Sequence, residues 1–141
     1  MLAQGLIIFS AGIVMLLGLV HLVYTYFGDK LHPRDADLLA RLKTTSPVIS
    51  RQTSVWKAYI GFNASHSLGA ILFGALYGFL AIEQPALLFH SWFLGFTGLI
   101  ALGAWFAMAK LYWFNRPLQG IALACLAYVA GFIFANMRVF A

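Results

Sequence analysis

The stretch Trp56-Lys-Ala-Tyr-Ile-Gly-Phe-Asn-Ala-Ser-His-Ser-Leu-Gly69 opens an apolar segment that continues past Tyr77 and is long enough to cross a bilayer. The segment nevertheless contains four polar residues, Asn63, Ser65, His66 and Ser67. Polar side chains at membrane depth cost several kcal/mol unless they are paired. The stretch therefore predicts a transmembrane helix that turns its amide and its imidazole toward other helices and away from lipid.

Composition places the whole chain in the same class. Of its 141 residues, 62% are hydrophobic and 9% are charged, whereas about a quarter of the residues in a soluble domain are charged. Without a linker-like stretch, we expect a single integral membrane domain over residues 1–141. The predicted fold is all-α, a four-helix antiparallel transmembrane bundle, because short connections force neighbouring helices to run antiparallel. The four apolar runs predict spans at about 2–27, 55–82, 86–112 and 117–137.

The first loop, residues 28–54, differs in character because it holds most of the charges. Between Pro33 and Lys43 it predicts a short amphipathic helix, with Pro33 at the start and acidic and basic residues at the ends that suit the helix dipole. Its apolar side is suited to lying on the membrane surface and is formed by Leu38, Leu39 and Leu42.

The positions of the basic residues predict the orientation. Most lie in the first loop or at its rim, and Lys110 and Arg116 fall on the same side, whereas the opposite side holds little more than Arg138. The positive-inside rule then puts both loops in the cytoplasm and both termini on the external side. Basic residues placed beside the lipid bilayer account for the net charge of +5. We therefore expect no nucleic-acid partner.

The second predicted helix has two distinct faces at 100° per residue. One face carries the polar groups and consists of Tyr59, Asn63, His66, Ser67, Ala70, Gly74 and Tyr77. The opposite face has a small-xxx-small pattern that lets another helix approach closely, and consists of Gly61, Ser65, Leu68, Gly69 and Leu72. We therefore expect this helix to be central, with neighbours on both sides. Ala127, Gly131 and Ala135 offer a similar close-packing face on the last helix.

Depth along the helices suggests where chemistry could take place. From the cytoplasmic edge, His21 lies about 9 Å deep, Asn63 about 12 Å and His66 about 16 Å. The candidate polar pocket consists of His21, Asn63, His66, Ser67, Thr97 and Tyr128, with a mouth of Trp56, Tyr59 and Trp105. Two interpretations remain open. These groups either hydrogen-bond one another and fix helix register, or they form a functional pocket for proton transfer or for the headgroup of an apolar ligand.

We predict no metal and no cofactor. His21 and His66 differ by about 7 Å in axial level, which does not suit bis-histidine haem ligation. No acidic residue lies in mid-membrane and Cys125 is the single cysteine, so a zinc or di-iron site lacks ligands. The chain also has no Gly-rich phosphate loop, no Ser-His-Asp constellation and no paired carboxylates.

Three stretches carry a family resemblance: 33–35, Ser46-Pro-Val-Ile-Ser-Arg-Gln-Thr53, and 56–69. Together they resemble an uncharacterised family of small bacterial four-helix integral membrane proteins. The resemblance implies a bacterial cytoplasmic (inner) membrane protein and implies no activity. The outline is also similar to DoxX-like bundles, a likeness of shape that does not transfer function.

Two functions are expected on these grounds. The first is an interaction or accessory subunit of a membrane complex, or a homo-oligomer, because the small-residue faces suit helix association and no catalytic set is recognisable. The alternative is a binder or enzyme for a lipid-like or quinone-like molecule that uses the intramembrane His/Asn pocket. Whether the protein is an enzyme stays open.

Overall fold

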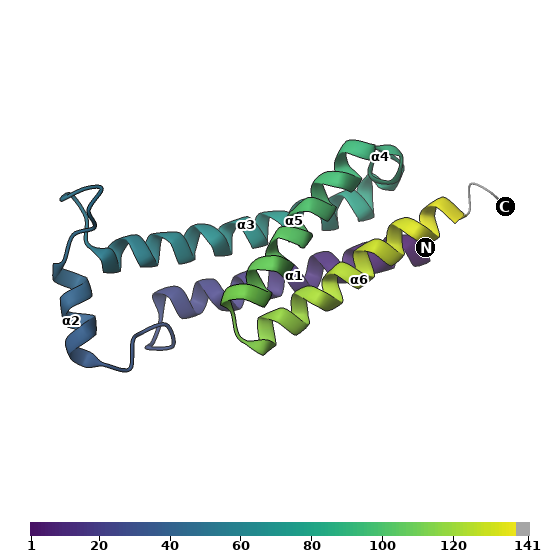
Figure 1. The fold of residues 1–141 in the computed structure, drawn as a ribbon. Coiled ribbons are helices and arrows are strands. Elements are labelled where there is room, and N and C mark those ends of the chain that lie inside the picture. The colour runs from purple at the N-terminus through teal and green to yellow at the C-terminus, as the bar shows by residue number, and fades with distance from the viewer. Residues whose placement is uncertain (138–141) are drawn as a thin grey trace. The chain divides into compact units, whose positions relative to one another are not determined.

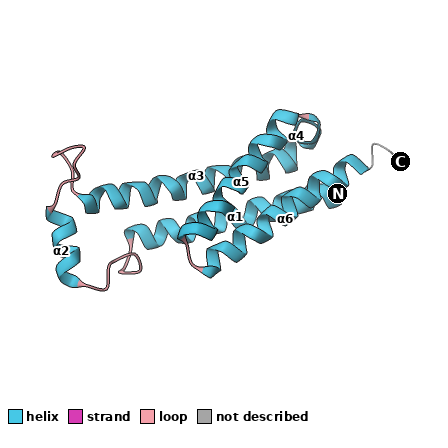
Figure 2. Cartoon of the chain, in the orientation of Figure 1, coloured by secondary structure: helices cyan, strands magenta, loops and turns pink. Residues whose placement is uncertain are grey.

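The computed structural model describes residues 1–137, and within that range the chain is helical with no strand (Figures 1 and 2). The helices are α1 Leu2–Tyr26, α2 Ala36–Thr44, α3 Val55–Glu83, α4 Pro85–His90, α5 Trp92–Tyr112 and α6 Asn115–Met137. Four of them, α1, α3, α5 and α6, are long and apolar enough to cross a membrane. The all-α class and the four apolar spans are thereby confirmed. Arg138, which entered the orientation argument, lies outside the described residues.

The third predicted span differs from the structure, because the chain divides it at Ser91 into α4 and α5. Ser91 has an extended backbone, with φ −87° and ψ 104°, and its side chain accepts a hydrogen bond from the Leu94 N–H at 3.3 Å. Serine is a favoured N-cap because its oxygen satisfies one of the free N–H groups of the first turn. The break therefore has a local cause that hydropathy alone does not reveal.

The described chain forms two compact units. The first, here called the core unit, contains residues 1–17 and the chain from Ala70 onward. The second, here called the loop unit, contains Gly18–Gly69. The helices α1 and α3 each contribute one end to the core unit and the other end to the loop unit.

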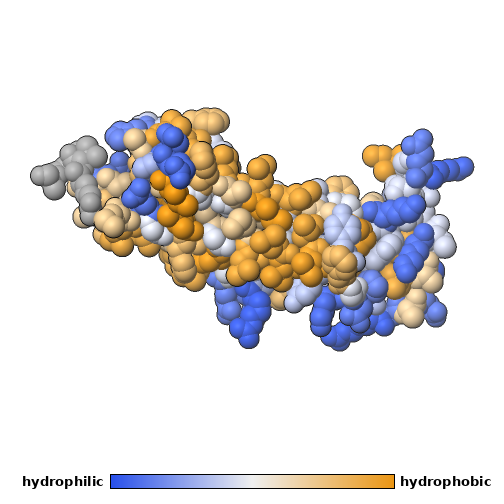
Figure 3. Space-filling view, turned by 180° about the vertical axis from the view of Figure 1, so that it is seen from behind, coloured by the Kyte–Doolittle hydropathy of each residue, from blue (hydrophilic) through white to orange (hydrophobic). Residues whose placement is uncertain are grey.

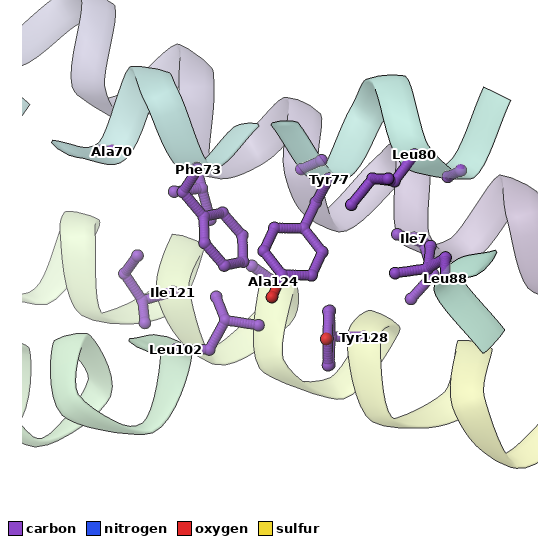
Figure 4. Packing of buried hydrophobic residues seen from close by; sticks show 13 residues of the cluster. Ile7, Ala70, Phe73, Tyr77, Leu80, Leu88, Leu102, Ile121, Ala124 and Tyr128 are labelled. Atoms are coloured by element: carbon purple, nitrogen blue, oxygen red, sulfur yellow. The ribbon is translucent and has the colours of Figure 1, made fainter. Parts of the chain in front are cut away.

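The core unit is held together by a cluster of buried apolar side chains from α1, α3, α4, α5 and α6 (Figure 4). The cluster consists of Ile7, Ala11, Val14, Ala70, Phe73, Tyr77, Leu80, Ala81, Leu88, Leu102, Ile121, Ala124 and Tyr128. Ser10 is also fully buried, and its hydroxyl donates to the Ala124 carbonyl at 2.8 Å. This bond joins α1 to α6 without leaving a buried polar group unpaired.

Two glycines bring helices of the core unit into close contact. A Cβ atom at Gly74 would lie 2.5 Å from Met15 Cβ and 2.6 Å from the Ala11 carbonyl oxygen, so α3 and α1 touch there through backbone. A Cβ atom at Gly131 would lie 2.8 Å from Ile7 Cδ1. The second contact confirms that the Gly131 face of α6 is a close-packing face. Small residues permit this approach because no side chain separates the helix backbones.

In the loop unit, the short helix α2 begins at Ala36 instead of Pro33. Asp35 is its N-cap, because the carboxylate accepts from the Asp37 N–H at 2.9 Å and from the Leu38 N–H at 3.1 Å. Arg41 and Lys43 lie in its last turn, as the dipole argument expects. Figure 3 shows hydrophilic residues gathered around this loop, whereas the long helices present mostly apolar residues.

Candidate functional site

Within the loop unit, α1 and α3 bring His21 and Asn63 into hydrogen-bond contact, with 3.0 Å between His21 Nε2 and Asn63 Oδ1. Asn63 Nδ2 donates to the Tyr59 carbonyl at 2.8 Å, so its oxygen is the atom turned toward the imidazole. An amide oxygen only accepts, so His21 Nε2 carries the hydrogen of this bond. The neutral ring then keeps Nδ1 as an acceptor.

His66 lies next to the same pair. Its ring meets the His21 ring edge-on, with 5.7 Å between the ring centroids and 89° between the ring planes. Both imidazoles are half-buried. The two imidazole rings are therefore in contact, although the sequence places His21 and His66 at different levels along their helices. No cluster of three or more His, Cys, Asp or Glu side chains suited to a metal ion occurs among residues 1–137.

Local hydrogen bonds satisfy the remaining polar groups around this pair. Ser67 is fully buried and donates to the Asn63 carbonyl at 2.9 Å. Thr25, only 6% exposed, donates to the His21 carbonyl at 2.8 Å. Both bonds run to the residue four positions earlier, as hydroxyls on helices often do. No buried side-chain nitrogen or oxygen among the described residues lacks a partner.

Three of the predicted pocket residues belong to the core unit, where each has its own surroundings. Tyr128 donates to the carbonyls of Gly95, at 3.1 Å, and Leu94, at 3.4 Å. Thr97 is exposed on α5. Trp105 packs against Phe73, with 5.3 Å between ring centroids. Of the nine residues predicted for the pocket and its mouth, the polar cluster therefore contains His21, Asn63, His66 and Ser67.

Trp56 and Tyr59, predicted at the mouth of that pocket, line a different one. The two rings are 5.4 Å apart, and the His32 ring meets Trp56 edge-on at 5.1 Å. The pocket has a volume of about 280 Å³ and is lined by Leu31, His32, Pro33, Leu42, Trp56 and Tyr59. A second pocket of about 310 Å³ is lined by Asp29, His32, Pro33, Arg34, Ala36 and Leu39.

These two pockets were not predicted from the sequence. The only local signal is the sequence Leu31-His-Pro33 directly after the first span. Its contact with Trp56 joins residues far apart in the chain and appears only in the folded loop unit. Across residues 28–57 the basic and acidic side chains form no ion pair with any described residue. Apart from the Asp35 carboxylate, which caps α2, these charges are available to a ligand.

The small-residue face of α3 is open. Gly61, Ser65 and Gly69 are exposed, and a Cβ atom at Gly61 or at Gly69 would meet nothing within 4 Å. The expectation that this helix has neighbours on both sides is thus wrong for a single described chain. Leu68 and Leu72, on the same face, are exposed as well, at 57% and 68%.

No protein-family model, curated protein or solved structure matches this chain. Its function has to be inferred from the chemistry and the packing of its own residues.

Proposed function

We propose that this membrane protein works as a homo-oligomer in which α3 of one copy packs against α3 of another. The observation that carries the proposal is the open face of Gly61, Ser65 and Gly69 on α3, where a Cβ atom at either glycine would meet nothing within 4 Å. Small residues four apart let two backbones approach closely, and the resulting van der Waals contact drives helix association in lipid.

A second copy suits this face better than an unrelated helix does. Copies inserted in the same orientation hold their α3 helices parallel, so the same small residues meet at the same depth. A two-fold dimer needs one self-complementary face on each copy. Ser65 satisfies its own hydroxyl by donating to the Phe62 carbonyl at 2.9 Å, so it can enter such an interface without leaving a donor unpaired.

Disulfide cross-linking in native membranes tests the dimer. Cys125 is the single cysteine, so Ser65→Cys in a Cys125→Ala background gives one reactive position at the centre of the face. We expect oxidation to give a covalent dimer of Ser65→Cys. The matched control is Gly103→Cys, because Gly103 on α5 is also exposed and open. A monomer under oxidation and after purification would contradict the proposal. A cross-link to a different membrane protein would indicate that this protein is an accessory subunit of a membrane complex.

Substitution by a bulky residue provides a second test. A Cβ atom at Gly61 or at Gly69 would meet nothing within 4 Å, so we expect each copy of Gly61→Ile and Gly69→Ile to fold. They should weaken the dimer by about 1 kcal/mol or more, because they separate the two backbones. Gly103→Ile, equally open, should leave the dimer unchanged.

The proposed location is a bacterial inner membrane, with the loop of residues 28–54 in the cytoplasm and both termini on the external side. Basic residues in that loop and at Lys110 and Arg116 support this orientation. In the Cys125→Ala background, an impermeant thiol reagent added to intact cells should label Gln84→Cys and spare Lys43→Cys. The opposite pattern would invert the orientation.

The half-buried imidazole pair favours a second function, binding of a lipid-like or quinone-like molecule at His21, Asn63 and His66. Intramembrane ionisable residues are often functional, and His21 Nδ1, the acceptor nitrogen of the ring that donates to Asn63, can accept a hydrogen bond from the hydroxyl of a reduced quinone. Extraction of the purified protein should yield quinone or lipid, and His66→Phe should reduce the amount severalfold. His90→Phe is the control, because His90 is exposed on α4. Equal yields from both variants would exclude this function.

A further inference from the structure

Two pockets of the loop unit adjoin each other, and His32 and Pro33 form a wall of both. Their linings differ in chemistry. The pocket of about 310 Å³ contains one acidic and one basic side chain, Asp29 and Arg34. The pocket of about 280 Å³ has a mainly apolar and aromatic lining that includes Leu31, Leu42, Trp56 and Tyr59. A charged site beside an apolar site matches the two ends of an amphiphile.

The location of the pockets also fits such a ligand. They lie where the chain has left α1 and enters α3, two helices apolar enough to cross a membrane. This end of the helices would meet the lipid headgroups, the level at which Trp and Tyr side chains are enriched. Pockets for small ligands typically span about 300–1,000 Å³, so each of these suits part of a lipid and not a whole one.

We propose that the two pockets bind a phospholipid whose headgroup carries both a phosphate and an amine. Arg34 faces the phosphate, because a guanidinium matches phosphate oxygens in pairs. Asp29 faces the ammonium group. The aromatic pocket of Trp56 and Tyr59 takes the start of the apolar part of the lipid.

Charge balance selects this headgroup over an anionic one. Asp29 and Arg34 cancel each other in the charged pocket, and neither forms an ion pair with a described residue. An anionic headgroup without an amine would satisfy Arg34 but leave the Asp29 carboxylate without a cationic partner, which an ethanolamine ammonium group supplies. A choline headgroup keeps the positive charge, but its methyl groups leave no N–H to donate to the carboxylate.

Native mass spectrometry of the full-length protein in detergent tests the proposal. The probes are phosphatidylethanolamine, phosphatidylglycerol and phosphatidylcholine with identical acyl chains, and soluble phosphoethanolamine. We expect phosphatidylethanolamine to bind most tightly. Arg34→Gln and Asp29→Asn should each weaken its binding about fivefold to tenfold, the effect of losing one partly exposed charge-assisted hydrogen bond. Trp56→Leu should weaken binding of the phospholipid and leave binding of phosphoethanolamine unchanged.

Arg51→Gln and Asp37→Asn are the matched controls, because these residues carry the same charges in the same loop and line neither pocket. Equal affinity for the three lipids, or equal effects of Arg34→Gln and Arg51→Gln, would overturn the proposal in favour of general surface attraction. Phosphoethanolamine binding as tightly as the lipid would overturn the role of the apolar pocket. The proposal does not depend on the α3 dimer, so cross-linking at Ser65 and lipid binding can fail separately.

Discussion

His21 on α1 donates a hydrogen bond of 3.0 Å to Asn63 on α3, and this bond ties the two long helices together in the loop unit. A polar contact of this kind in a membrane contributes about 0.6 kcal/mol on average. Its direction and its fixed partners make it more important for register than for stability. It holds the face of α3 that carries His66 toward α1, and it leaves the face of Gly61, Ser65 and Gly69 open.

A double-mutant cycle measures this bond directly. His21→Leu and Asn63→Leu, alone and combined, should give a coupling free energy of about 0.6–1.7 kcal/mol in denaturant unfolding in detergent. Asn136→Leu is the matched control, because Asn136 on α6 makes the same local bond, to the Phe132 carbonyl, that Asn63 makes to Tyr59. Additive single effects would show that the two side chains do not interact in the folded protein.

Gly74→Ala should destabilise the core unit by about 1–3 kcal/mol, the usual effect of overpacking. The new methyl group would meet the Ala11 carbonyl oxygen and the Met15 Cβ atom, and backbone cannot rotate away as a side-chain end can. Gly78→Ala on the same helix is the control, since its nearest neighbour would be Ala11 Cβ at 4.0 Å. Thermal unfolding in detergent compares the two, and an equal melting temperature would contradict the close approach of α1 and α3.

The buried Tyr77 hydroxyl donates to the Leu94 carbonyl at 2.8 Å, across from α3 to α5. Tyr77→Phe should lower the free energy of unfolding by about 1 kcal/mol, the net contribution of a typical hydrogen bond. Tyr112→Phe should change it little, because Tyr112 is 79% exposed. Denaturant titration of both variants checks the difference. If Tyr77→Phe leaves the free energy of unfolding unchanged, the hydrogen bond to the Leu94 carbonyl is absent in the membrane protein.

Asp35→Ala should loosen α2 without affecting the core unit. The carboxylate is the side-chain N-cap of this helix, and losing an N-cap typically costs about 1 kcal/mol. Hydrogen exchange of the α2 amides should accelerate about fivefold, while amides of α5 and α6 keep their rates. Asp37→Ala removes a carboxylate from the same turn but leaves the cap in place, so it should accelerate exchange less. Equal rates in the two variants would rule out capping by Asp35.

The local structure was largely predictable. Apolar run length alone predicts the four long helices, because a backbone in lipid must satisfy its own hydrogen bonds and a helix does so within one segment. Spacing also separated the two faces of α3. Asp35 and Ser91 are residue types favoured at N-caps. The prediction instead started the short helix at Pro33, because proline suits a first turn, and treated 86–112 as one apolar run.

By itself, the sequence determined which segments are helices and which of their faces are polar, since both follow from interactions within about one helical turn. Only the tertiary structure decided which residues meet. It joined His21 to Asn63 and His32 to Trp56, gave Tyr128 its partners in the core unit, and left Gly61 and Gly69 uncovered. The physical reason is that such contacts depend on how helices distant in the chain pack, and hydropathy varies too little along these apolar helices to specify that packing.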